Sequence, residues 1–245
     1  MRLDRLVVDR HRSVARVRLS GEPLDEREAA ELVAVAGDLA EDHSVRAVVV
    51  TSRGRNLCPG PASTLDALAF RPDPAAALAA LRPPVVAACG GEVASVGLEL
   101  ALAADVRLAD ASARLSLPDV AEGRLPCWGG TQRLPRAVGP ARAVTMLLLG
   151  AALDAPAALA SGLVHQVVDV DDLDGAVDDL AGHLAGLAPL ALELAKEAVW
   201  RGVELPMADG LRLEGDLNHL LQTTADRAEG LEAFFAKREP RFAGR

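Results

Sequence analysis

Residues 84–119 read PVVAACGGEVASVGLELALAADVRLADASARLSLPD, and the elements they predict form the centre of the expected fold. An apolar run rich in β-branched residues is followed by a glycine turn and an apolar helix, which is the order of elements expected of a buried strand and its packing helix in a parallel sheet. Glu99 and Asp119 interrupt sequence that is otherwise typical of a core. A buried carboxylate is costly unless it is paired, neutral or functional, so these two acids are the first candidates for chemistry.

Strands and helices continue to alternate on both sides of this stretch. Leu3 to Asp9 and Val14 to Leu19 have period two and predict an antiparallel hairpin that turns at 11–13. The proline-rich pieces at 72–74 and 83–84 indicate a surface excursion over 62–82. The remaining expected elements are helices at 26–41, 128–138 and 141–149 and strands at 46–51, 84–89, 105–108, 114–117 and 163–168.

From Asp171 onward nearly every segment has the period of an amphipathic helix. The clearest apolar stripe, at spacings of three and four, consists of Leu213, Leu217, Leu220 and Leu221. Such a face needs a partner, which is either the rest of this domain or another subunit. We therefore divide the chain into an α/β core over 1–185 and a helical region over 186–245.

Composition excludes several classes of protein. The net charge of -9 argues against a nucleic-acid groove, which would need clustered positive charge. The three cysteines are odd in number and lack paired spacing, so we expect reduced thiols in a cytoplasmic protein. No segment approaches the roughly 20 uncharged apolar residues of a membrane span. We expect no membrane and no nucleic-acid partner.

Three segments carry distinctive motifs: RPPVVAACGGEVASVGLELALAADVRLAD at 82–110, GGTQRLPR at 129–136 and KREPRFAGR at 237–245. In these motifs, and over almost its full length, the chain resembles the enoyl-CoA hydratase/isomerase (crotonase) family. The resemblance implies an α/β fold of ββα turns wound into a spiral, closed by a helical region over 186–245 that drives trimerisation and covers the active site. It implies a homotrimer or a hexamer built as a dimer of trimers.

The resemblance also implies a substrate and a reaction. The expected substrate is an acyl thioester carried by coenzyme A or by an acyl-carrier protein, with no metal and no cofactor other than the CoA that belongs to the substrate. Glu99 and Asp119 match the two family carboxylates, which in hydratases hold one water and pass its proton to the α-carbon, whereas isomerases manage with one carboxylate. Asp119 replaces the usual glutamate and is shorter by one methylene, about 1.5 Å, which weakens the case for water addition more than that for proton transfer. The alternative is structural: an arginine pairs with Glu99, and Asp119 caps a turn.

The oxyanion donors of the family are altered in this chain. The first donor segment corresponds to 57–62, including Leu57 and Gly60, and its donor position falls on Pro61, which has no backbone N–H. A shift of one residue would offer the N–H of Ala62 instead. The second donor, the middle of three glycines in the family, falls on Val96 in Ser95-Val96-Gly97, where the first turn of the helix leaves backbone donors free.

Other residues narrow the function further. Cys127 occupies a loop position that faces the acyl chain in the family, although we expect a buried, inert thiol. The chain contains no tyrosine, and none of its histidines falls in these segments, which disfavours phenol- and histidine-assisted members of the family. Two hypotheses remain: an enzyme of the enoyl-CoA hydratase/isomerase type that acts through an oxyanion-stabilised enolate, and a catalytically weakened homologue that serves as a structural or stimulatory subunit.

Overall fold

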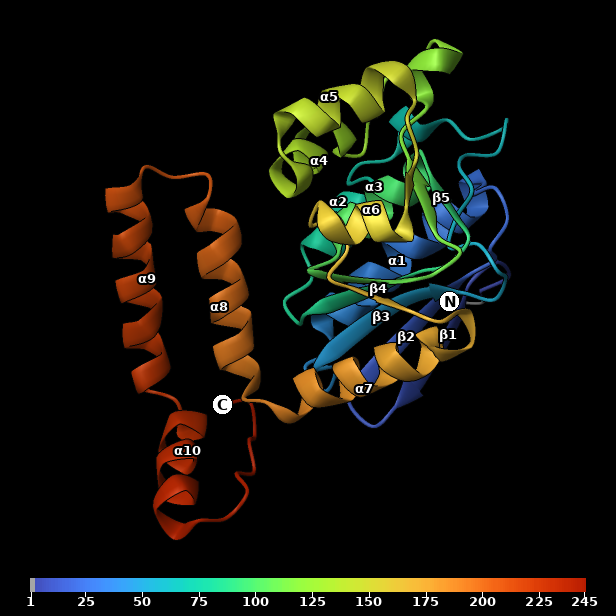
Figure 1. Cartoon of the computed structure of the whole chain (residues 1–245). Coiled ribbons are helices and arrows are strands. Elements are labelled where there is room, and N and C mark those ends of the chain that lie inside the picture. The colour runs from blue at the N-terminus through green and yellow to red at the C-terminus, as the bar shows by residue number, and fades with distance from the viewer. Residues whose placement is uncertain (1–2) are drawn as a thin grey trace.

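The computed structural model describes residues 3–245 and contains two sheets (Figure 1). In the larger sheet β1 is antiparallel to β2 and all other neighbours are parallel. Its order is β1 (Val7–His11), β2 (Val14–Leu19), β3 (Ala47–Ser52), β4 (Val85–Cys89), β6 (Val106–Asp110) and β9 (Gln166–Val168). The smaller sheet has the order β5 (Glu92–Ala94), β7 (Arg114–Ser116) and β8 (Leu153–Asp154). The predicted α/β class is confirmed.

The central strands of the larger sheet are buried on both faces, whereas the edge strand β1 is largely exposed. Val48 and Val50 of β3 belong to the main core, while Val49 points to the opposite face and packs with Val177 of α7 (Leu173–Gly186). This explains why the central strands are continuous apolar runs and not alternating ones.

Six helices precede α7, and most were predicted. They are α1 (Glu26–Glu41), α2 (Pro74–Ala79), α3 (Val96–Ala103), α4 (Gly130–Val138), α5 (Pro140–Leu149) and α6 (Ala155–Ala160). The prediction of a surface excursion over 62–82 is wrong in part, because α2 packs into the core with Leu78 fully buried. Asp73 caps α2 by accepting a hydrogen bond from the Ala76 N–H, and this local signal was present in the sequence.

The first strand begins later than its alternating pattern predicted. The backbone N–H groups of Asp4, Arg5 and Leu6 all donate to the Glu31 carboxylate of α1, each at 2.9 Å. A side chain 25 or more residues away therefore takes the donors that a strand ladder would have used.

The C-terminal helices α8 (Pro189–Gly202), α9 (Met207–Gln222) and α10 (Ala225–Ala236) form an arm beside the core (Figure 1). Its contact with the core includes Asp105, whose carboxylate binds Lys196 Nζ at 2.7 Å and Trp200 Nε1 at 2.8 Å. Leu217 is buried between helices, but Leu220 remains exposed. The helical nature of 186–245 is confirmed, and its apolar face is only partly covered within the chain. Over residues 3–245 no helix combines the length and the apolarity needed to cross a bilayer.

Gly97 sets how closely α3 approaches the loop after β3. A Cβ at this position would lie 2.2 Å from the Cys58 carbonyl oxygen, which is backbone and has no room to move. Gly182 of α7 has nothing within 4 Å of the corresponding position. The first glycine is therefore required by packing, and the second is not.

We expect Gly97→Ala to lower the free energy of unfolding by about 3 kcal/mol or to prevent folding, since overpacking against a fixed backbone costs 1–3 kcal/mol or more. Gly182→Ala is the matched control and should stabilise the protein by about 0.5–1 kcal/mol, because alanine is the better helix former. Urea unfolding of the two variants measures both effects. Equal stability of the two would contradict the packing role of Gly97.

Candidate active site

A cavity of about 580 Å³ lies between the loop after β3, the first turn of α3 and the segment 119–127. Five of the eight residues that the sequence nominated border it: Pro61, Val96, Glu99, Asp119 and Cys127. The other three lie outside its lining. Leu57 is buried in the core, Gly60 has a φ of 132° and bonds to the neighbouring chain segment, and Gly97 packs against Cys58.

Glu99 is held by backbone amides and not by a cation. Its Oε1 accepts hydrogen bonds from the N–H groups of Trp128 at 2.8 Å and Gly130 at 2.7 Å. Its Oε2 is buried and has no hydrogen-bond partner. The structural alternative, in which an arginine pairs with Glu99, is therefore contradicted. The helix α4 begins at Gly130 and not at Trp128 as predicted, because Gly129 has a φ of 100°, outside the helical region.

Burial is the main reason why the pKa of Glu99 is raised, to about 7. Glu99 is only 1% exposed. The two amide hydrogen bonds lower the pKa, and the nearby charge of Asp119 raises it, but neither outweighs desolvation. At neutral pH both the protonated and the ionised form of Glu99 are therefore populated.

Asp119 faces the same cavity and is bound in a similar way. Its Oδ1 accepts a hydrogen bond from Ser95 Oγ at 2.5 Å and lies 3.6 Å from an Arg124 nitrogen. Its Oδ2 is buried without a hydrogen-bond partner. Asp119 opens a short 3-10 helix, Asp119–Glu122, but its carboxylate bonds across to Ser95 and does not cap that turn. Each acid thus has one oxygen fixed by the protein and one left free.

The position predicted for the first oxyanion donor, residue 61, is held in register by Leu24. The Leu24 N–H donates to the Gly60 carbonyl at 2.9 Å, and the Ala62 N–H donates to the Leu24 carbonyl at 2.9 Å. The rescue that would use the Ala62 N–H is therefore contradicted, because that donor is already bound. In such a ladder the backbone groups of the intervening residue point away from the partner, so position 61 faces the other way, and as proline it has no donor there.

The position predicted for the second oxyanion donor, residue 96, keeps a backbone N–H. Val96 is the first residue of α3 and borders the cavity. Its N–H lies at the helix N-terminus, outside the intrahelical hydrogen bonds, where the helix dipole favours negative charge.

Cys127 corrects one expectation. The thiol is exposed and borders the cavity, whereas the sequence predicted a buried one. Desolvation by the surrounding protein, with smaller contributions from acidic neighbours that include Glu99, raises its pKa to about 11. A thiol that stays protonated at neutral pH is a poor nucleophile, so the expectation that it is unreactive agrees with its surroundings.

Sequence reasoning missed what Trp128 and Ser95 do at the cavity. Trp128 is 1% exposed, and its indole N–H donates to the Ala67 carbonyl at 2.8 Å, which ties the loop at one wall to the segment that holds Glu99. A lone tryptophan beside GGTQRLPR was the available signal. No local pattern indicated a partner for Ser95, since Asp119 lies 24 residues away.

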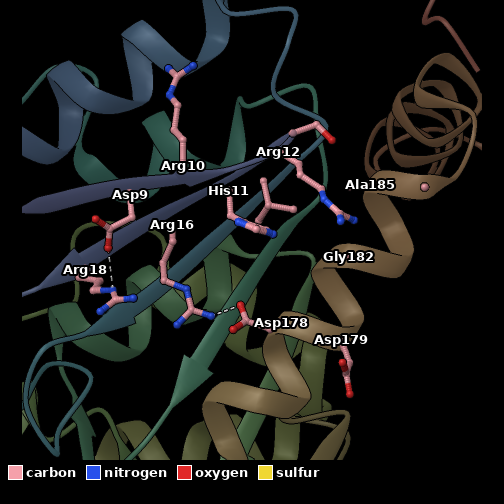
Figure 2. Close-up of a pocket in the computed structure, with 13 residues that line it drawn as sticks. Asp9, Arg10, His11, Arg12, Arg16, Arg18, Asp178, Asp179, Gly182 and Ala185 are labelled. Atoms are coloured by element: carbon pink, nitrogen blue, oxygen red, sulfur yellow. Dashed lines mark hydrogen bonds and ion pairs between the residues drawn. The ribbon is translucent and has the colours of Figure 1, made fainter.

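A second cavity of about 580 Å³ lies between the β1–β2 hairpin and α7 (Figure 2). Two of its arginines pair with carboxylates: Arg16 pairs with Asp178, and Arg18 pairs with Asp9 at 3.2 Å (Figure 2). None of the carboxylates that border it has a buried oxygen without a hydrogen-bond partner, unlike Glu99 and Asp119 beside α3. Across residues 3–245 no group of His, Cys, Asp and Glu side chains is arranged to hold a metal ion.

Comparison with known proteins agrees with the motifs. The family model described as enoyl-CoA hydratase/isomerase matches residues 9–245. The chain is 37% identical over 223 residues to "Probable enoyl-CoA hydratase echA8" of Mycobacterium bovis, covering 88% of this chain and 87% of that one. It is 39% identical over 217 residues to the 2,3-dehydroadipyl-CoA hydratase of Escherichia coli K12, covering 84% of each. The crystal structure of an enoyl-CoA hydratase from Bacillus anthracis superposes with a TM-score of 0.91 at 31% identity, covering 99% of this chain and 100% of that one.

Burial of Glu99 predicts a stability that depends on pH. A carboxyl whose pKa is raised on folding stabilises the folded state below its unfolded pKa of 4.5, and this contribution is lost as pH rises through about 7. Glu99→Gln removes the titration. We therefore expect the free energy of unfolding of the variant, relative to that of the wild type, to increase from pH 5 to pH 8 by up to about 3 kcal/mol. Urea unfolding at both pH values measures the difference. A gap between the two proteins that is the same at both pH values would contradict a raised pKa.

Proposed function

Because the chain belongs to the enoyl-CoA hydratase/isomerase family, we propose that it is a hydratase that adds water across the double bond of a 2-enoyl thioester. The observation that carries the proposal is the pair of free carboxylate oxygens, Glu99 Oε2 and Asp119 Oδ2, buried beside one cavity. Two such acceptors suit a water molecule held between them. Isomerisation, which needs one carboxylate, is the variant that this pair supports less well.

The proposed step needs one proton shared by the two acids. One carboxylate takes a proton from the water molecule as the water oxygen attacks the β-carbon. The proton held on the other carboxyl group passes to the α-carbon. A bond from oxygen to the β-carbon and a bond from hydrogen to the α-carbon form, the double bond is lost, and the dyad again carries one proton. The pKa of Glu99, about 7, keeps this singly protonated form populated near neutral pH.

The developing negative charge on the thioester oxygen would be stabilised by the Val96 N–H. Position 61 supplies no second donor, so the enzyme is expected to be slow for its class. The same feature favours a second candidate function, in which the chain is a structural or stimulatory subunit with weakened turnover. The Ala62 N–H is already bound to the Leu24 carbonyl and therefore does not replace the donor that is lost at position 61. This strengthens the alternative.

The carrier, the assembly and the compartment belong to the same proposal. Either coenzyme A or an acyl-carrier protein could present the thioester. Exposed apolar side chains on the arm, among them Leu211, Leu220 and Phe234, support packing on further copies in a homotrimer or hexamer. A lid role for 186–245 would also need another copy, because the residues that border the cavity lie within 61–127. The free cysteines are compatible with a cytoplasmic setting.

Hydration of crotonyl-CoA tests the two acids. We expect Glu99→Gln and Asp119→Asn each to lower kcat by about 10²- to 10⁴-fold, the usual contribution of an acid or base, with little change in the Kd of butyryl-CoA, a saturated analogue. Wild-type kcat/KM should fall above about pH 7 as the shared proton is lost. For an isomerase that uses Glu99 as its base, kcat/KM would instead rise above about pH 7, because the base must be ionised.

Glu122→Gln is the matched control, since Glu122 is an exposed carboxylate in the same segment that pairs with Arg124. It should leave turnover unchanged. A wild type without hydratase or isomerase turnover would exclude the enzymatic proposal and favour the subunit.

Pro61→Ala should restore a donor. The new N–H would point away from Leu24, on the side of residue 61 that the ladder leaves free, so we expect kcat/KM to rise by about 10-fold or more, given that one oxyanion donor is worth 10²- to 10³-fold. Pro59→Ala is the control, because it relaxes the same loop without adding an N–H beside the cavity. Equal rates for both variants would show that position 61 does not face the thioester oxygen.

A further inference from the structure

We propose that Ser95 is a positioning residue that holds Asp119 in its working orientation, a role that rests on the hydratase function proposed above. The hydroxyl would fix one carboxylate oxygen so that the other always faces the water. A side-chain hydrogen bond would thereby orient Asp119, as hydrogen bonds from two backbone amides orient Glu99.

Contacts of the hydroxyl support this role. Ser95 is only 2% exposed, borders the cavity, and donates from Oγ to Asp119 Oδ1 at 2.5 Å. A hydrogen bond to an ionised group is among the stronger ones. Arg124, the other polar group near this oxygen, stands farther off at 3.6 Å. The orientation of a short carboxylate therefore depends mainly on Ser95.

The backbone of Ser95 shows how firmly it is placed. Its φ of 51° and ψ of -123° lie in a region that favours glycine, yet the residue carries a side chain. The conformation is held from both sides, because the Ser95 N–H donates to the Ser116 carbonyl at 3.0 Å and the Ser95 carbonyl accepts from the Glu99 N–H at 3.1 Å. Ser116 lies three residues before Asp119, so one short segment is joined to Ser95 through both backbone and side chain.

In both acids one carboxylate oxygen is held by hydrogen bonds and the other has no partner. In Glu99 the fixed oxygen accepts from the backbone N–H groups of Trp128 and of Gly130, the first residue of α4. In Asp119 the fixed oxygen accepts from the hydroxyl of Ser95, the residue that precedes α3. In both, the remaining oxygen is buried without a partner. Each acid therefore has one oxygen held by the protein and one that no protein group binds.

Ser95→Gly tests the role, because it removes the hydroxyl and also relieves the strained φ. We expect kcat for crotonyl-CoA to fall about 10- to 100-fold, as for a reacting group misplaced by about 1 Å. The Kd of butyryl-CoA and the unfolding midpoint should not worsen. Ser95→Ala, which keeps the strain, should lose kcat equally. Ser112→Ala is the matched control and should leave kcat unchanged, since Ser112 Oγ also donates to a carboxylate, Asp110 Oδ1 at 2.7 Å, but neither residue borders the cavity.

A double-mutant cycle shows whether Ser95 works through Asp119. In an Asp119→Asn background, Ser95→Gly should cause no further loss of kcat. Losses that multiply, or a Ser95→Gly enzyme as fast as the wild type, would overturn the positioning role while leaving the hydratase function intact. A wild type that turns over no enoyl thioester would overturn both.

Discussion

The hydrogen bonds from the backbone of Trp128 and Gly130 to Glu99 are the constraint on which the site depends. A carboxylate on an otherwise apolar helix would be too costly to bury without them. They tie the start of α4 to the middle of α3, and the Trp128 indole extends the connection to the loop on the opposite wall. Because only one carboxylate oxygen is used, the other stays available to a substrate or a water.

The second acid follows from the spiral. Parallel pairing of β5 with β7 places Ser95 beside Ser116, and the chain then needs only three more residues to bring Asp119 to the cavity. The strained backbone at Ser95 is the local cost of this junction, and such strain commonly marks functional positions. The fold thus brings both acids to one cavity, whereas of the two predicted oxyanion positions only Val96 has a backbone N–H. The loop at Pro61 is paired with Leu24 in a register that uses the Ala62 N–H for structure.

Much of the fold was predictable from local patterns. The helix at 26–41 agrees with α1 in both boundaries, and the hairpin turns where the alternation of strand residues breaks. The strands β5 and β8 were missed because three and two residues are too short to show a period. The first strand was extended too far because Glu31, on a distant helix, captures the backbone donors of residues 4–6.

By itself the sequence determined the α/β class, the family motifs and the two acids, because periodicity, glycine placement and residue type are local properties. It took the tertiary structure to show that Glu99 and Asp119 border one cavity, that Ser95 hydrogen-bonds to Asp119, that Cys127 is exposed, and that the Ala62 N–H is already bound. These are contacts between segments that are distant in the chain. Their geometry depends on strand register and close packing, and no short stretch of residues carries that information.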